Sequence, residues 1–218
     1  KFVLVFFDDI LIYSQTWEDH LRHVQHVFEL LREHGLLLKQ TKCSFGKKEV
    51  GYLGHVISRE GVKVDQTKIE VITTWPRPST VKAVRGFLGL SGYYRKFIQD
   101  YGVIAAPLTQ LLKKAGFHWS EEAENAFISL KKSLSESPVL ALPDFTKSFI
   151  IECDASGCGI GAVLLQQDHP IAFFSRKLAE RHHKLAAYER ELIGLAKAVI
   201  HWRPYLWGQR FLVRTDHY

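Results

Sequence analysis

Residues 2–14 read FVLVFFDDILIYS, two apolar runs of strand length with Asp8 and Asp9 between them. Val5 and Ile10 are among several β-branched residues in these runs. Both runs fit buried strands that are too short to cross a membrane. We therefore predict a β-hairpin whose tip carries two carboxylates.

Two explanations of the acid pair are open from the residues alone. A turn often holds an Asp, usually with a Gly after it, because the Asp side chain tolerates the dihedral angles of the turn. No Gly follows Asp9. Two adjacent acids between apolar strands repel each other and lose hydration, and a divalent cation with oxygen ligands relieves both costs. The pair is either a solvated turn or a metal site.

The box Phe6-Phe7-Asp8-Asp9, followed by ILIYS, resembles the polymerase box of reverse transcriptases in the Phe-containing form of Gypsy-type LTR retrotransposons. The resemblance implies that Asp8 binds catalytic Mg²⁺, with Mn²⁺ as the alternative ion, and that Asp9 helps to hold the site. It also implies an RNA template, a DNA primer and deoxynucleoside triphosphates as partners of the parent protein.

The composition limits the class of protein. The 218 residues can form one large domain or two small ones, and a hydrophobic content of 46% supports real cores. The formal charge of +6 and the pI near 9.2 favour an anionic partner but do not identify it as nucleic acid. Cys43, Cys153 and Cys158 lack metal-type spacing, so reduced thiols are expected. The absence of a signal peptide and of an apolar run of about 20 residues argues against a secreted or membrane-spanning chain.

The next segment predicts a helix that begins after a Thr16 or Ser14 cap, ends at Gly35 and packs under the hairpin. Its apolar stripe is expected at Leu21, Val24, Phe28 and Leu31. His20, His23 and His26 on this helix suggest zinc. However, steps of three drift around a helix, and no Cys or acid completes a tetrahedral set.

Short strands are expected at 36–38, 43–45 and 50–57, broken by glycines. Residues 50–55 read VGYLGH, which resembles the primer grip of the reverse transcriptase family. In that family a Leu-Gly turn, here Leu53 and Gly54, lets the backbone approach the 3′ end of the primer. An ordinary glycine-containing hairpin is the alternative.

A helix at 64–75 is expected to end before Pro76, and a longer one is expected from about Thr80 to Ile98. The second helix places one set of residues on a basic stripe by steps of three and four: Lys82, Arg85, Gly89, Gly92 and Lys96. The opposite side is expected to be buried: Val84, Phe87, Leu88, Ser91, Tyr94 and Ile98.

Each mid-helix Gly costs roughly 1 kcal/mol relative to Ala, so the two glycines of the stripe suggest that something comes very close. A phosphate backbone and a second packed helix are the two candidates. The segment VKAVRGFLGLSGYYRKFI resembles the Gypsy-type thumb, whose helix tracks the minor groove of the template-primer.

The second half is richer in strands. Helical segments at 101–115 and 121–135 lead to a proline-bounded linker at 137–144. Strands at 149–154, 160–166 and 171–174 predict an antiparallel meander, followed by a helix at about 184–201 and a strand at 210–215. Period two places Glu152 and Asp154 on one face of the first strand. The helix is expected to bury a stripe of Leu185, Tyr188, Leu192, Leu195 and Val199, with Glu191 on the same face.

This order of elements would gather three carboxylates at one sheet edge, and such sites commonly run two-metal phosphodiester hydrolysis. ECDASG at 152–157, YEREL at 188–192 and RTDH at 214–217 resemble the first three acidic motifs of retroelement RNase H. The resemblance implies that Asp154, Glu191 and Asp216 bind the metals that cut RNA in RNA/DNA hybrids.

The expected fold class is α/β (α+β), with a palm hairpin and a helical thumb followed by an incomplete RNase H-like mixed sheet. The expected segments are palm with primer grip (1–60), thumb (61–115), connection (116–146) and RNase H-like domain (147–218). The remaining catalytic acids of both sites are expected before Lys1 and after Tyr218. The isolated 218 residues are therefore expected to show weak or absent activity in primer extension and in hybrid cleavage.

The parent is expected to act inside cytoplasmic virus-like particles, with the nucleus as a second compartment. A catalytically inert nucleic-acid-binding remnant is the alternative function. A third possibility, a lone metal-dependent nuclease, would explain neither the hairpin nor the basic stripe.

Overall fold

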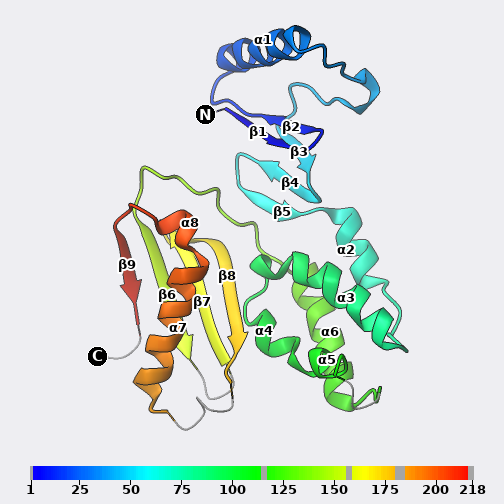
Figure 1. The fold of residues 1–218 in the computed structure, drawn as a ribbon, viewed down its shortest axis with the longest axis vertical. Coiled ribbons are helices and arrows are strands. Elements are labelled where there is room, and N and C mark those ends of the chain that lie inside the picture. The colour runs from blue at the N-terminus through cyan, green and yellow to red at the C-terminus, as the bar shows by residue number, and fades with distance from the viewer. Residues whose placement is uncertain (1, 114–116, 156–158, 180–184, 216–218) are drawn as a thin grey trace. The chain divides into compact units, whose positions relative to one another are not determined.

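The computed structural model describes residues 2–113, 117–155, 159–179 and 185–215 (Figure 1). The chain divides into two compact units, Lys1–Arg59 and Glu60–Tyr218. Helices and strands are mixed in both, so the predicted α/β (α+β) class is confirmed. Within the described residues, no helix is both long and apolar enough to cross a membrane.

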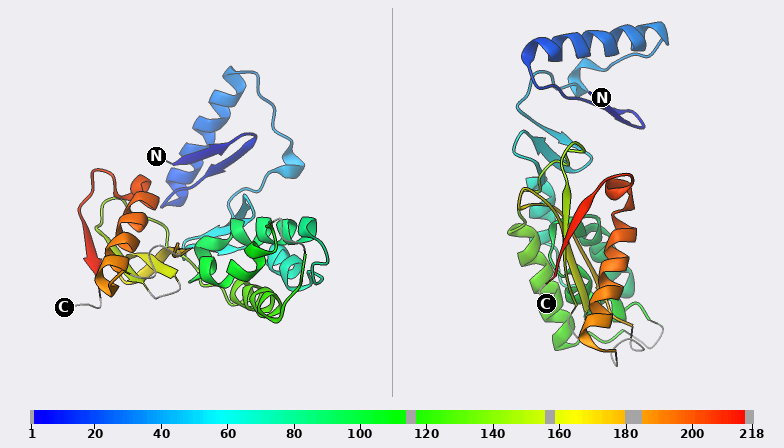
Figure 2. Two further views of the ribbon diagram at one scale, coloured as in Figure 1. Left: turned by 60° about the horizontal axis from the view of Figure 1, so that its bottom comes forward. Right: turned by 90° about the vertical axis from the view of Figure 1, so that its left-hand side faces the viewer.

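The first unit is built on the predicted hairpin. Phe6 pairs with Asp9, so Phe7 and Asp8 form a two-residue turn. The helix that follows is capped by Thr16, whose hydroxyl oxygen accepts a hydrogen bond from the Asp19 amide at 3.1 Å, and it runs beside the hairpin (Figure 2). In chain order the elements are β1 (Val3–Phe6), β2 (Asp9–Ile12), α1 (Trp17–Glu33), η1 (Gln40–Lys42), β3 (Glu49–Tyr52) and β4 (His55–Ser58).

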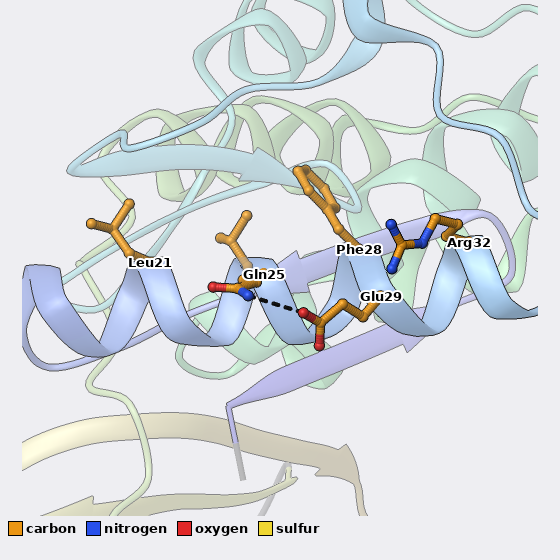
Figure 3. A pocket seen from close by; sticks show the side chains of 6 residues that line it. Leu21, Gln25, Phe28, Glu29 and Arg32 are labelled. Carbon is orange, nitrogen blue, oxygen red and sulfur yellow. Dashed lines mark hydrogen bonds between the residues drawn. The ribbon is translucent and has the colours of Figure 1, made fainter.

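The burial expected in this unit is largely wrong. Most of β1 is exposed, and the buried residue of α1 is Val27. Leu21 and Phe28 instead line a groove of about 450 Å³ on the outside of α1 (Figure 3). The short β2 strand offers little apolar surface, so α1 buries only a narrow stripe against it. The strands expected at 36–38 and 43–45 are irregular chain beside η1.

The second unit begins with a helical bundle. Its elements are β5 (Val62–Val64), α2 (Gln66–Thr73), α3 (Val81–Tyr93), η2 (Arg95–Phe97), α4 (Tyr101–Ile104), α5 (Ala106–Gln110) and α6 (Glu121–Ser135). The side of α3 expected to be buried is buried, with Val84, Phe87 and Ser91 fully enclosed. However, α3 ends at Tyr93 and not at Ile98. The chain reverses there, which brings the Tyr101 hydroxyl within 3.0 Å of the Ser91 hydroxyl.

A four-stranded sheet follows, with α7 along one face (Figure 1). Its elements are β6 (Phe149–Ala155), β7 (Gly159–Gln166), β8 (His169–Lys177), α7 (Ala187–His201), α8 (Arg203–Leu206) and β9 (Phe211–Arg214). The order is β8-β7-β6-β9, with β6, β7 and β8 antiparallel and β9 parallel to β6. The predicted meander is confirmed. Phe149, Ile151 and Cys153 are buried, and Asp154 is exposed, so the predicted alternation along β6 is also confirmed.

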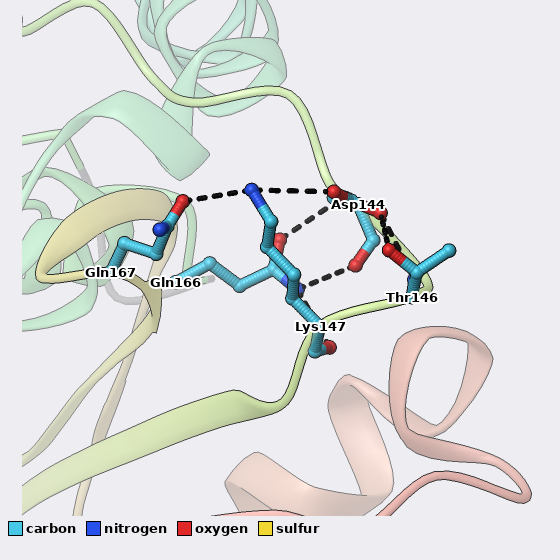
Figure 4. Close-up of polar contacts among 5 residues, drawn as sticks. All are labelled: Asp144, Thr146, Lys147, Gln166 and Gln167. Carbon is cyan, nitrogen blue, oxygen red and sulfur yellow. Dashed lines mark hydrogen bonds and ion pairs between the residues drawn. The ribbon is translucent and has the colours of Figure 1, made fainter.

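The proline-bounded linker is tied to both parts of this unit. The Leu140 and Val62 backbones exchange two hydrogen bonds of 2.8 and 2.9 Å, and the Ala141 amide donates to the Pro170 carbonyl at 2.7 Å. Further on, Asp144 is held by the side chain of Gln166 (Figure 4). Such bonds hold the connection in one conformation.

Candidate nucleic-acid interface and carboxylate sites

The hairpin tip presents its acids to solvent. Asp8 lies in the turn, Asp9 opens β2, and both are exposed. Phe7, between the strands, is 86% exposed and has a φ of +51°. A bulky side chain in the left-handed region is uncommon, and such strain persists where the surroundings or a function require it. The tip therefore combines two exposed carboxylates with a strained, exposed aromatic residue.

The turn between β3 and β4 has the same character. Leu53 and Gly54 occupy its two central positions with φ of +50° and +72°. Asn-Gly or Gly-Gly would suit this turn better than a Leu. The Leu53 carbonyl lies 2.8 Å from His55 Nδ1, which fixes the turn from inside. The expected glycine-containing hairpin is present, and its role at a primer end stays a prediction.

The stripe on α3 is only partly as expected. Lys82, Arg85 and Gly89 are exposed, and a Cβ added to Gly89 would meet nothing within 4 Å. Packing therefore does not explain Gly89. Gly92 differs, because a Cβ there would lie 3.3 Å from the Tyr101 hydroxyl. Each of the two explanations therefore fits one glycine. Gly92 allows close packing against Tyr101, whereas the space beside Gly89 is open to a ligand.

Lys96 does not belong to the stripe. It lies in η2, beyond the end of α3, and its ammonium nitrogen is 5.2 Å from the centroid of the Phe97 ring. Burial lowers the pKa of this lysine. The expected position of Lys96 is wrong because the helix was expected to run five residues too far.

Tyr93 takes the place of Lys96 on the stripe, and sequence reasoning missed it. The side chain is 53% exposed and lies four residues after Gly89, which itself lies four after Arg85. Residues spaced by four share one helix face. That spacing was visible in the sequence, but Tyr93 was assigned to neither side of the helix, and only its neighbour Tyr94 was expected to be buried, as it is.

Asp154 opens into a cleft of about 930 Å³ on the sheet. The polar residues of its lining are Gln99, Asp100, Glu152, Asp154, Arg214 and Thr215. Arg214 Nη1 donates hydrogen bonds of 2.9 Å to Glu152 and to Asp168, and these bonds raise the pKa of Arg214. The arginine thereby fixes β9 against β6 beside the cleft.

Asp100 is a second residue that sequence reasoning missed. It has a φ of +56°, and although it precedes α4 it makes no side-chain cap of that helix. Burial, and then the charge of Asp154, raise the pKa of the Asp100 carboxyl. Two carboxylates from distant segments therefore face one cleft. No sequence motif pointed to Asp100, because only the fold brings it to Asp154.

Glu191 lies half-buried on α7. Burial raises the pKa of the Cys153 thiol to about 11, and the charges of Asp154 and Glu191 add to that rise. Both acids therefore lie near the same sulfur. Asp216 falls outside the described residues. Within those residues, no three His, Cys, Asp or Glu side chains group as a metal site would require.

The face that α7 buries is only partly the one expected. Leu195 and Val199 pack against the sheet core as expected. Tyr188 and Leu192 are each 66% exposed, whereas Gly194 and Ala198 are buried. A Cβ on Gly194 would lie 2.9 Å from the Ile160 side chain. Small residues let the helix sit close to the sheet, and this close contact outweighs the larger apolar side chains.

The histidines of α1 are held by local contacts. The Ser14 hydroxyl lies 2.8 Å from His23 Nδ1 and 3.3 Å from His20 Nδ1. The His23 ring also stacks on Phe2, with centroids 3.8 Å apart. Local hydrogen bonds therefore engage Nδ1 of both His20 and His23.

Two family profiles match the chain. Residues 1–57 match the reverse transcriptase (RNA-dependent DNA polymerase) family, and residues 119–213 match the RNase H-like domain found in reverse transcriptase. Among solved structures, the foamy viral protease-reverse transcriptase in complex with dsDNA, in its dRH form, covers 99% of this chain and 39% of its own with a TM-score of 0.93. The same enzyme with an RNA/DNA hybrid gives a TM-score of 0.91 and covers 30% of its own chain. Both are 24% identical to this chain, so they show a shared fold.

Curated relatives match the whole length of the chain. The retrovirus-related Pol polyprotein from transposon 297 of Drosophila melanogaster is 42% identical over 219 residues, and that from transposon gypsy is 38% identical over 231. The Transposon Tf2-3 polyprotein of Schizosaccharomyces pombe is 34% identical over 223 residues. The chain spans about a fifth of each, namely 21%, 22% and 17%. The chain therefore belongs to the family of retrovirus-related Pol polyproteins of gypsy-type transposons, and it carries their reverse transcriptase and RNase H-like parts.

Proposed function

We propose that this chain is part of an RNA-directed DNA polymerase with ribonuclease H, which copies RNA into DNA and cuts RNA in RNA/DNA hybrids. The exposed stripe of Lys82, Arg85, Gly89 and Tyr93 on α3 carries this proposal. We assign residues 1–60 to the palm, 61–115 to the thumb, 116–146 to the connection and 147–218 to the RNase H-like domain.

The stripe suits the backbone of a duplex. Lys82 and Arg85 supply cations for phosphates, and the bare Cα of Gly89 lets a sugar or a base edge come close. Tyr93 adds a flat exposed ring at the end of the same row. None of these groups reads a base sequence, which fits an enzyme that must hold any template with its primer.

The hairpin tip suits the polymerase reaction. Asp8 and Asp9 offer carboxylate oxygens, the donors that Mg²⁺ and Mn²⁺ prefer, and both are exposed. When bound, such ions stabilise the charge that develops in phosphoryl transfer from a deoxynucleoside triphosphate. The strained Phe7 and Leu53 hold two turns in fixed shapes, one for the acids and one for the primer end.

The cleft on the sheet suits hybrid cleavage. Asp154 and Glu191, together with Asp216, would hold the divalent ions that hydrolysis requires. Asp154 is exposed at the end of β6, where the backbone of a cut strand can reach it. At the end of β9, Arg214 bonds to Glu152, its register partner on β6 beside the cleft.

A catalytically inert nucleic-acid-binding remnant is the second candidate. The observation that supports it is the same exposed stripe of Lys82, Arg85, Gly89 and Tyr93. This candidate needs the stripe on α3 but not the acids. For either candidate we infer a cytoplasmic site of action in virus-like particles, with the nucleus as a second compartment.

Binding and catalysis are tested separately. Fluorescence anisotropy of the 218-residue chain with a labelled RNA/DNA hybrid is expected to show binding that Arg85→Ala weakens. The charge-matched control Lys132→Ala, on α6, is expected to bind as the wild type does. Equal losses of hybrid affinity in Arg85→Ala and Lys132→Ala would show that the stripe is not part of the interface.

A longer Pol segment that includes the flanking sequence then tests catalysis with Mg²⁺. Asp8→Asn is expected to abolish primer extension alone, and Glu191→Gln hybrid cleavage alone. Binding without either activity in the wild-type segment would favour the inert remnant.

A further inference from the structure

The segment from Gln99 to Val103 lies directly on the sheet. The Gly102 amide donates a 2.7 Å hydrogen bond to the Ser175 hydroxyl of β8. A Cβ on Gly102 would lie 2.8 Å from the Ser175 carbonyl oxygen and 3.0 Å from the Arg176 Cα. Real Cβ atoms almost never come this close to backbone, so only glycine permits this contact.

Two glycines of β7 complete the contact from the other side. The Val103 side chain fills the space beside Gly159, where a Cβ would collide with it. The Asp100 carboxylate lies over Gly161, with Oδ1 2.8 Å from the position of a Cβ. The backbone of α4 therefore contacts β8, and the side chains of Asp100 and Val103 contact β7. We call this contact of residues 99–103 with β7 and β8 the interlock.

The linker forms a second fastening. Its residues Leu140 to Lys147, here called the strap, bond to Val62 at one end and to Pro170 and Gln166 at the other. Gln166 is only 5% exposed, and its amide accepts from the Asp144 amide at 2.9 Å. It also donates to the carbonyls of Asp144 and Lys147 at 2.8 and 3.0 Å (Figure 4).

Neither fastening resembles an ordinary connection between domains. Such connections are usually exposed and make few contacts, so relative motion is the default expectation. Here we propose that the interlock and the strap join the helical bundle (α2, α3, α5, α6) and the sheet (β6–β9) into one cooperative body. The consequence, which rests on the proposed function, is that a hybrid gripped by α3 meets Asp154 at a constant separation.

Native-state hydrogen exchange of the 218-residue chain tests the cooperative body without any ligand. The probes are core amides of the bundle, Phe87 and Leu130, and of the sheet, Ile151 and Leu164, all fully buried. In one cooperative body, all four amides exchange through the same opening and have protection factors within about threefold of each other. Protection factors that already differ by roughly a hundredfold or more between the two cores would overturn the proposal.

Variants separate the interlock from general stability. Gly102→Ala is expected to divide the cores, with their protection factors differing by roughly tenfold or more. The matched control is Gly86→Ala, a glycine of α3 whose Cβ would make an ordinary 3.6 Å contact with Trp75. It is expected to leave the cores together. Ser175→Ala removes the hydroxyl without adding a clash and serves if Gly102→Ala does not fold. Cores that stay together in both interlock variants would contradict the proposal.

A hybrid arm separates this inference from the proposed function. A ligand that binds only the folded state protects every amide of its cooperative unit by the same factor, about tenfold at ten times its Kd. RNA/DNA hybrid is therefore expected to protect both cores by equal factors in the wild type and by unequal factors in Gly102→Ala. Protection confined to the bundle of the wild type would overturn the inference. Absence of protection anywhere would instead refute the binding function, while the ligand-free exchange would still decide on the cooperative body.

Discussion

The side chain of Gln166 and the backbone of Asp144 form a two-way pair: the Asp144 amide donates to Oε1, and Nε2 donates to the Asp144 carbonyl. The pair joins the linker to β7 across 22 residues of sequence. Such pairing of a buried amide with backbone mimics one rung of a sheet.

Replacement of Gln166 by Leu keeps the volume but removes these bonds. Partly buried backbone groups then lose their partners, so the free energy of unfolding is expected to fall by about 2 kcal/mol. Urea unfolding followed by tryptophan fluorescence measures the change. Gln167→Asn is the control, because Gln167 is exposed and its bond to Lys147 is worth less than about 0.5 kcal/mol. Equal effects of the two substitutions would show that the pair does not hold the linker.

The stripe on α3 predicts different salt dependence for two basic residues. Arg85→Ala is expected to weaken hybrid binding and to reduce the slope of log K against log salt by about 1, because one phosphate contact is lost. Lys96→Ala is expected to leave the slope unchanged, since Lys96 lies over Phe97 in η2. Anisotropy titrations at several salt concentrations measure both. A smaller slope of log K against log salt in Lys96→Ala would show that Lys96 does contact the hybrid.

Tyr93 is expected to contribute contact without charge. Tyr93→Ala should weaken hybrid binding about tenfold, as the loss of one stacked or packed aromatic contact does, with no change in the salt slope. Tyr188→Ala, which removes a tyrosine that is 66% exposed from α7, is the control and should bind normally. Similar affinities of the two variants would argue that the stripe ends before Tyr93.

Asp65 predicts a stability effect at acid pH. Its carboxylate accepts hydrogen bonds of 2.8 Å from the Thr67 amide and hydroxyl at the start of α2, and these lower its pKa from the ordinary 3.8. The stabilisation is therefore complete above pH 3.8 and is lost as pH falls through the lower folded-state pKa.

Asp65→Ala should cost about 1 kcal/mol at pH 7, and the difference from wild type should shrink as the pH falls below 3.8. Urea unfolding at pH 7 and near pH 3 measures both values. Asp65→Asn keeps the cap without the charge. If the difference in unfolding free energy between the wild type and Asp65→Ala stayed constant between pH 7 and pH 3, the assigned hydrogen bonds would be contradicted.

Cys153 predicts slow thiol chemistry. With a pKa near 11 the thiolate is on the order of one part in a thousand at pH 8, and the sulfur is buried against α7. Iodoacetamide should therefore label Cys43 well before Cys153 in the folded chain, and both alike in urea. Peptide mapping by mass spectrometry measures the order. Because the pKa is raised, ionisation of Cys153 opposes folding as pH rises from 9 to 11.

The features predicted well from sequence depend on local pattern. The hairpin around Asp8, the helix Glu121–Ser135 with its Ser120 cap, and the alternation along β6 each follow from a few adjacent residues. The acid motifs at Asp154 and Glu191 were likewise found from short stretches of adjacent residues.

The features missed depend on contacts between distant segments. The end of α3 is set by the return of Tyr101, and the buried face of α7 by the fit of Gly194 to Ile160. Asp100 reaches Asp154 only because α4 lies on the strands. No periodicity within one segment carries that information.

The open strand β1 has a practical consequence. Val5, Phe6 and Phe7 are 64%, 51% and 86% exposed, and among the described strands β1 pairs with β2 alone. A bare strand border beside uncovered aromatic rings is a template on which identical chains stack. Concentrated preparations of this polypeptide should therefore turn turbid or form fibrils, and dilute samples or a solubilising fusion will be needed to handle it.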